Sequence, residues 1–191
     1  MNLRITILTL LILGNAAITR AESTPEEVVV TYFASFKESD MKNLASNMHP
    51  DELTKFRKMM LPVMVKGISM TTNVDESEDA MAMQVFTGDD SIGNISNESP
   101  EAFFTRFMKW VMTINPDMKS SMESAKIEPV GHVMEGDLAH VVYRMKVEML
   151  GTFVTQISAI TLKKNGDEWK LMLTGEIEGM SKLLEANINQ M

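Results

Sequence analysis

The strongest constraint on the fold is a two-residue alternation that runs from Ala139 to Met149. The odd-numbered residues of this segment are apolar, and the even-numbered residues are polar or charged except for Val142. A period of two places successive side chains on opposite faces of a strand. The segment is therefore predicted to be a long strand with one buried face and one face toward solvent.

Turn signals lie on both sides of this strand. Asn165-Gly166 favours a tight hairpin, because both residues tolerate positive φ. Glu135-Gly136-Asp137 suits a second tight turn, and Gly151 marks a further reversal. The turns separate four predicted strands, at 126–134, 139–149, 153–163 and 169–173. Short turns between successive strands predict an antiparallel meander.

Helix signals precede the predicted sheet. Thr24-Pro25-Glu26-Glu27 combines an N-cap threonine, a proline at the first helical position and a glutamate three residues after the cap. Apolar side chains then recur at helical spacing as far as Phe36. Asp40 is suited to cap a second, short helix. A third helix is predicted from Asp51 to Pro62, where the proline is expected to end it.

The middle of the chain and its end give five further predictions. Residues 63–70 and 80–86 are predicted to be strands, and the polar stretch 87–99 is predicted to be a loop. A wide apolar stripe predicts a strong helix over 100–114. A closing helix is predicted over 178–188. Helices followed by an antiparallel meander form an α+β fold, with N-terminal helices packed on a curved sheet.

The first 21 residues resemble a secretory signal. Arg4 supplies a positive start, Ile5–Leu13 is an uncharged aliphatic run, and small residues follow as far as Ala21. The apolar run is short for a bilayer span, although a retained anchor helix is the alternative. We therefore predict a signal peptide at 1–21, a single domain at 22–191, and a periplasmic or secreted location.

Charge and cysteine content exclude several classes of protein. The formal charge is −8, and removal of Arg4 and Arg20 makes it −10. Without a dense basic run, neither nucleic acid nor an anionic membrane surface is an expected partner. No later apolar stretch has the length of a membrane span. The chain has no cysteine, which rules out a thiol nucleophile and a cysteine-based zinc site.

No metal and no cofactor is predicted. The 19 methionines offer soft ligands for cuprous ion, but methionine more often fills irregular apolar space. His49 is remote, and His132 and His140 could converge across a hairpin but have no third ligand. The sequence has no glycine-rich phosphate loop. Asn94 and Asn97 begin glycosylation sequons, which matter only in a eukaryotic secretory route.

Three features together resemble a known superfamily. They are the capped first helix, the short second helix at Asp40–Leu44, and the strands and turns from Gly136 to Leu171 with a tryptophan after the last hairpin. Over about residues 24–60 and 122–176 the chain resembles the nuclear-transport-factor-2-like superfamily, which includes ketosteroid-isomerase-like proteins. The resemblance implies a cone-like sheet around the helices, with a pocket between them.

The residues expected to line such a pocket are Tyr32, Phe36, Trp110 and Tyr143. An isomerase-like member would also need a carboxylate base inside the pocket. Glu148 falls on the polar phase of its strand and Asp137 lies in a turn, so no catalytic residue is assigned.

Two classes of function remain open from the sequence. The first is a non-catalytic module that binds a small hydrophobic ligand or a protein partner after export. The alternative is a small-molecule isomerase or lyase that uses the pocket between helices and sheet. Homodimerisation through the outer face of the sheet is a further hypothesis, suggested by Val142 on an otherwise polar strand face.

Overall fold

A computed structural model describes residues 22–71, 78–149 and 152–173, with isolated positions near the C-terminus. The predicted signal peptide at 1–21 and most of the predicted closing helix at 178–188 lie outside the described residues.

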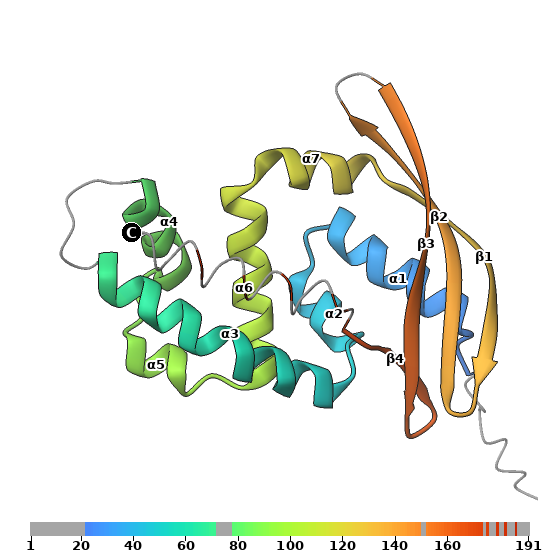
Figure 1. Ribbon diagram of the computed structural model, residues 1–191, viewed down its shortest axis with the longest axis horizontal. Helices are drawn as coiled ribbons and strands as arrows, with labels where there is room; N and C mark the ends of the chain where they lie inside the picture. Colours follow the sequence, from blue (N-terminus) through green and yellow to red (C-terminus); the bar gives the residue numbers. More distant parts are fainter. Residues whose placement is uncertain are drawn as a thin grey trace, which may run out of the picture.

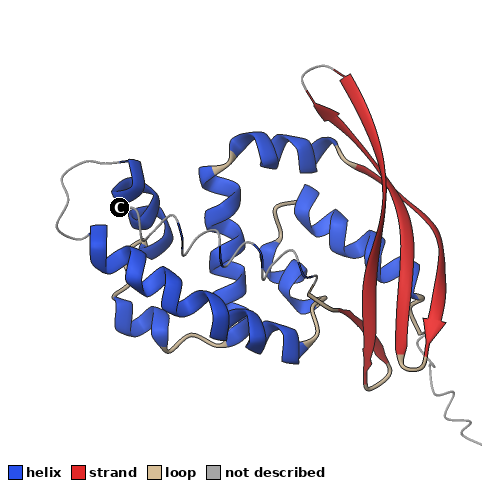
Figure 2. Ribbon diagram, in the orientation of Figure 1, coloured by secondary structure: helices blue, strands red, loops and turns tan. Residues whose placement is uncertain are grey.

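The described chain is an α+β fold in which the helices precede the sheet (Figure 1). Figure 2 shows the strands together at one side of the molecule and the helices beside one face of the sheet. The helices are α1 (Pro25–Lys37), α2 (Met41–Ser46), α3 (Pro50–Thr71), α4 (Glu78–Thr87), α5 (Ile92–Ser96), α6 (Pro100–Ile114) and α7 (Pro116–Ser124). The strands are β1 (Lys126–Glu135), β2 (Leu138–Met149), β3 (Thr152–Asn165) and β4 (Glu168–Leu171).

The predicted antiparallel meander is confirmed. The strands pair in the order β1-β2-β3-β4, and each neighbour is antiparallel. Gly136 and Gly166 occupy the two tight turns at φ +62° and +64°, in the left-handed region that favours glycine. The odd-numbered face of β2 is the buried one, as the alternation predicts, since Tyr143 and Val147 are each only 8% exposed.

Helix α1 lies on the inner face of the sheet. Its N-terminus has the predicted capping box, because the Thr24 hydroxyl accepts from the Glu27 N–H and the Glu27 carboxylate accepts from the Thr24 N–H. Glu26 Oε1 contacts Nδ1 of His132 on β1 at 2.6 Å. Two turns further on, the ring of Phe33 packs on Tyr143 of β2. These contacts fix the first helix across two strands.

The helical end of the molecule, formed by α3 to α6, has an aromatic core. Phe56 of α3 is fully buried, and its ring centre lies 5.0 Å from those of Phe104 and Phe107 of α6. Methionine contributes to the same core, since Met60 and Met64 are also fully buried. Other methionines are exposed, including Met81 at 53%. The buried methionines fit the role of core filling.

Helix α3 does not end at Pro62, and the strand predicted at 63–70 is wrong. The helix continues to Thr71. A proline inside a helix loses one backbone hydrogen bond and crowds the preceding turn, at a cost of about 3 kcal/mol. Here the residues after it are anchored by burial, and their buried positions recur three or four residues apart, at Met60, Val63, Met64, Gly67 and Ile68. That period is helical, so the packing of α3 offsets the cost of the proline.

Two other predictions from the middle of the chain are also wrong. Residues 80–86 are helical, within α4, because Met83 and Phe86 face inward three residues apart while Val85 is exposed. The polar stretch 87–99 contains the short helix α5, where the Ser91 hydroxyl accepts from the N–H of Asn94. Helix α7 was not predicted separately. The predicted helix over 100–114 is confirmed as α6.

The beginning and the end of the described fold meet at β4. The His49 N–H donates to the Leu171 carbonyl, and the Leu171 N–H donates to the Asn47 carbonyl, each at 2.8 Å. These bonds join the end of α2 to the last strand. Over the residues that the structure describes, no helix has both the length and the apolar content that a membrane crossing requires.

Candidate functional site

The four residues predicted to line a pocket fall in two separate places. Tyr32, Phe36 and Tyr143 lie between α1 and the sheet, where Phe33 links them. Trp110 lies on α6 at the helical end, where its ring packs on Phe86 and Phe107. The structure therefore brings three of the predicted residues together and leaves Trp110 out.

The cluster between α1 and the sheet is filled by its own rings. Tyr32 lies 5.3 Å from Phe33 and 5.2 Å from Phe36, and Phe33 lies 5.1 Å from Tyr143, between ring centres. These are contact distances for aromatic pairs, so no ligand fits between these rings. Burial, with a smaller contribution from Tyr143, raises the pKa of Tyr32. The Tyr32 phenol therefore stays protonated at neutral pH.

The structure shows which polar side chains are buried. Among the side chains that it describes, the buried polar ones are Ser35, His49 and Thr71, and none is a carboxylate. Glu148 and Asp137 are exposed, as their positions in the sequence predict. A site of the isomerase type uses a carboxylate base beside the phenol.

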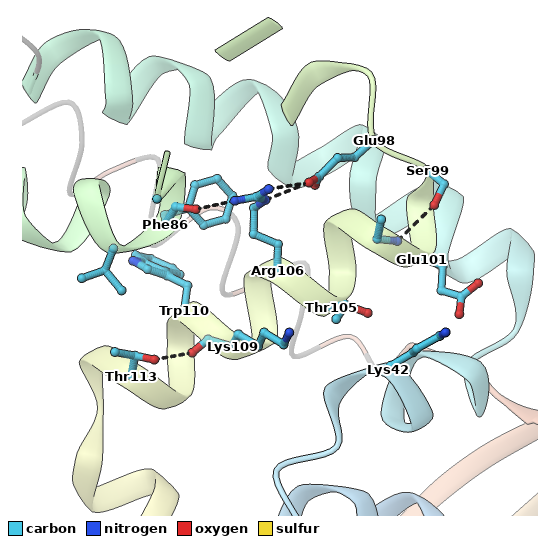
Figure 3. A pocket seen from close by; sticks show the side chains of 13 residues that line it. Lys42, Phe86, Glu98, Ser99, Glu101, Thr105, Arg106, Lys109, Trp110 and Thr113 are labelled. Carbon is cyan, nitrogen blue, oxygen red and sulfur yellow. Dashed lines mark hydrogen bonds and ion pairs between the residues drawn. The ribbon is translucent and has the colours of Figure 1, made fainter. Parts of the chain in front are cut away.

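Trp110 lines a groove of about 640 Å³ at the helical end (Figure 3). The groove runs along α6, with α4 on one side and Lys42 of α2 at one end. The indole N–H of Trp110 donates to the Ala82 carbonyl at 2.8 Å, which fixes the ring against α4. Sequence reasoning missed this groove because the strands predicted at 63–70 and 80–86 left no helix beside α6.

Arg106 is the central charge of the groove and is fully engaged by the protein. Its guanidinium donates to Glu98 at 2.6 Å, to Asp90 at 2.5 Å, and to the carbonyls of Phe86 and Thr87. Hydrogen bonding to Glu98 raises the pKa of Arg106, and hydrogen bonding to Arg106 lowers the pKa of Asp90. Arg106 thus ties the connections around α5 to α6 and has little capacity left for a ligand.

The hydroxyl groups of the groove also have structural partners. Ser99 caps α6 by accepting from the Ala102 N–H, and the Thr113 hydroxyl donates to the Lys109 carbonyl. The Thr105 hydroxyl donates to the carbonyl of Met41 at 3.4 Å. No histidine lines the groove to activate them. Within the described chain, no three histidine or acidic side chains group to hold a metal ion.

The two sheet histidines do not converge. His132 pairs with Val141 and therefore shares the inner face, where it contacts Glu26. His140 pairs with Thr161 on the outer face, where its ring nitrogens contact Thr161 and Glu135 at 3.0 Å. Neighbouring positions on a strand point to opposite faces, which separates the two rings.

The outer face of the sheet carries an exposed apolar surface, which we call the outer patch: Val133, Val142, Phe153 and Ile157. Val133, Phe153 and Ile157 are 59–65% exposed, and Val142 is half-buried. All four lie on the outer face. Val142 is an even-numbered residue of β2, and each of the other three pairs with an even-numbered residue of β2. Sequence reasoning found Val142 alone, although the uncharged stretch 152–162 was a visible signal.

Two of the charged side chains around the outer patch have partners on the same face. Arg144 donates to Glu128 at 3.1 Å, between β2 and β1. The ammonium group of Lys146 lies 4.6 Å from the ring centre of Phe153. With these charges occupied, the apolar side chains are what the outer face offers for recognition.

Comparisons with known proteins add little. No family model matches the sequence, and no curated protein is similar to it. One solved structure, described as TerC co-crystallised with polyporic acid, aligns at 16% identity over 83% of this chain and 96% of that chain. Its TM-score of 0.38 is too low to support any statement about the fold or the function of this chain.

Proposed function

We propose that this chain is an exported, non-catalytic module that binds a protein partner through its sheet. The observation that carries the proposal is the distribution of exposed apolar side chains. Three of the large ones, Val133, Phe153 and Ile157, share the outer face of the sheet with the half-buried Val142. An apolar surface of this kind is typical of a protein-interaction site.

The aromatic cluster between α1 and the inner face of the sheet also supports the proposal. The resemblance to the nuclear-transport-factor-2-like superfamily leads one to expect a ligand pocket between helices and sheet. That position is filled here by Tyr32, Phe33, Phe36 and Tyr143 in ring contact. The preferred partner is a polypeptide with an apolar, weakly charged surface, because Arg144 and Lys146 beside the outer patch already have partners on that face.

Site-specific photo-crosslinking in the producing cell tests the proposal. We would place p-benzoylphenylalanine at Val133, in the outer patch, and at the exposed Val85 of α4 as a reference site. We expect a discrete crosslinked product from position 133 only. Ile157→Lys should abolish that product, whereas Val85→Lys should leave it unchanged. A product that survives Ile157→Lys would contradict binding through the outer patch.

The isomerase or lyase alternative has its own test. Purified protein would be assayed against small ketones and esters, and the assay repeated with Tyr32→Phe. We expect no turnover by either form. Turnover that Tyr32→Phe abolishes would overturn the non-catalytic proposal, because it would assign chemistry to the buried phenol.

A further inference from the structure

Part of β3 has an unpaired edge. Within the described chain β4 pairs with residues 162–165 of β3, and the Met172 N–H donates to the Thr161 carbonyl, so that residues 152–160 pair with β2 alone. Residues 152–157 are exposed on both faces, including Phe153 at 59%, Val154 at 44% and Ile157 at 64%. Figure 1 shows this end of the β2–β3 hairpin beyond α7.

This edge lacks the features that normally prevent strand pairing. From Thr152 to Leu162 the sequence is TFVTQISAITL, without a charged residue or a proline. Soluble proteins usually protect a long edge strand with lysine, proline, a bulge or a covering element. An uncharged edge rich in β-branched and aromatic residues is instead a template for another strand.

We infer that a second copy of this chain pairs with the edge at residues 152–158, antiparallel and about a two-fold axis at Thr155. This register places Phe153 opposite Ile157 of the partner subunit, and it does so twice by symmetry. Aromatic side chains opposite β-branched ones stabilise antiparallel pairs. The same register places Val154 opposite the partner's Gln156. The inference goes beyond the proposed function, because the pairing uses the edge of β3 and leaves the outer patch to another partner.

Charge does not oppose this pairing, although the chain is acidic overall at −8. No charged residue lies within the paired segment. The nearest cation across the sheet is Lys146 of β2, which pairs with Thr155 of β3. Two copies of Lys146 would be separated by three strand spacings, about 14 Å. That separation exceeds the Debye length at physiological ionic strength.

The resulting dimer joins two four-stranded sheets at their edges and leaves the outer patch accessible. Main-chain pairing over seven residues buries little surface by the standard of stable dimers. The dimer is therefore expected to exchange with monomer in a concentration-dependent way. This arrangement differs from packing of two outer faces against each other, in which Val133 would lie inside the interface.

Sedimentation of the full chain over a wide concentration range tests the association. We expect a monomer–dimer equilibrium, with Thr155→Lys raising the dissociation constant by about tenfold or more, because two like charges meet at the axis. Val133→Lys, on the same face but away from the edge, should leave the equilibrium unchanged. Loss of the dimer in Val133→Lys but not in Thr155→Lys would overturn edge pairing in favour of face packing.

Single cysteines then test the register, since the chain has none of its own. Thr155→Cys should form a disulfide-linked dimer under mild oxidation, because residues directly opposite have Cβ atoms about 5 Å apart. Thr152→Cys is a matched control on the same exposed strand. In the inferred register its two copies lie six residues apart, about 20 Å, and cannot be bridged. Efficient crosslinking of Thr152→Cys instead would overturn the register.

The two proposals fail in distinguishable ways. Monomer at every concentration, without a disulfide from Thr155→Cys, would overturn the inference of a second copy. A crosslinked product from position 133 that contains a different protein would still support the proposed function in that case. A product from position 133 composed of two copies would contradict edge pairing, because Val133 lies on β1, away from the paired edge.

Discussion

The helical end of the molecule and the projecting end of the sheet both contain large apolar side chains, but bury them to different extents. At the helical end, phenylalanine is buried and each charge near the core has a partner, as Phe56 and Arg106 illustrate. At the end of the β2–β3 hairpin, Phe153 and Ile157 are more than half exposed. Apolar side chains therefore stabilise the fold in one region and remain available in the other.

This difference separates stability from recognition. A buried side chain contributes to folding through the surface that it removes from water. An exposed apolar side chain gains that contribution only when a partner covers it. Substitutions at the helical end should therefore lower the free energy of unfolding, while substitutions on the hairpin should change association and leave folding nearly unaltered.

The largest effect is expected from the aromatic core. Phe56→Ala should lower the free energy of unfolding by about 3–5 kcal/mol, because it leaves a cavity among the rings of α6. Ile157→Ala should change it by no more than about 0.5 kcal/mol, because that side chain is exposed. Urea denaturation of both variants measures the contrast. Equal losses would remove the distinction between the two regions.

A smaller contrast is expected between two arginines. Arg106→Ala should cost about 1–3 kcal/mol, because it leaves the partly buried Glu98 carboxylate without its donor. Arg144→Ala removes an exposed ion pair with Glu128 and should cost less than about 1 kcal/mol. Thermal unfolding of the two variants side by side gives the ranking. A larger loss in Arg144→Ala would contradict the role given to Arg106.

Substitution of Pro62 is expected to raise the free energy of unfolding, whereas the substitutions above lower it. Pro62→Ala should raise the free energy of unfolding by about 1–2 kcal/mol. It restores a helical hydrogen bond, and this gain exceeds the loss caused by the greater conformational freedom of the unfolded chain. Pro25→Ala provides a comparison, because proline at the first position of α1 loses no bond. No stabilisation by Pro62→Ala would mean that α3 has already relaxed around the proline.

The smallest effect concerns pH and the contact between α1 and β1. Hydrogen bonding to His132 lowers the pKa of Glu26 below its ordinary 4.5. The contact therefore stabilises the fold above about pH 4.5 and is lost as the pH falls through the lowered pKa. Glu26→Gln should cost less than about 1 kcal/mol at pH 7, and the cost should shrink as the pH falls through the lowered pKa. Glu148→Gln, which changes an exposed carboxylate, should show no such dependence.

Much of the sheet could be predicted from the sequence, because its signals are local. The alternation in β2 and the turns at Gly136 and Gly166 fix strand order and register without distant information. The first helix was also predictable, since the capping box beginning at Thr24 marks its start. The α+β fold follows from these elements.

The helical end was predicted less well because its signals compete. Pro62 indicates a helix end, and short apolar runs do not distinguish a buried strand from a helix. Burial of Met64 and Ile68 decides the matter, and burial depends on α6, more than thirty residues away. The separation of Trp110 from Tyr32 has the same origin, since it follows from how the helices pack.

The bond between Lys170 and the Ser46 carbonyl spans 124 residues and has a consequence for biosynthesis. A chain that emerges from the ribosome N-terminus first cannot make this closure until its last strand has been synthesised. Until then, α6, β1 and β2 can already contact α1 and α2, but the bonds between the end of α2 and the last strand are missing. The closing step of the fold therefore waits for the end of synthesis.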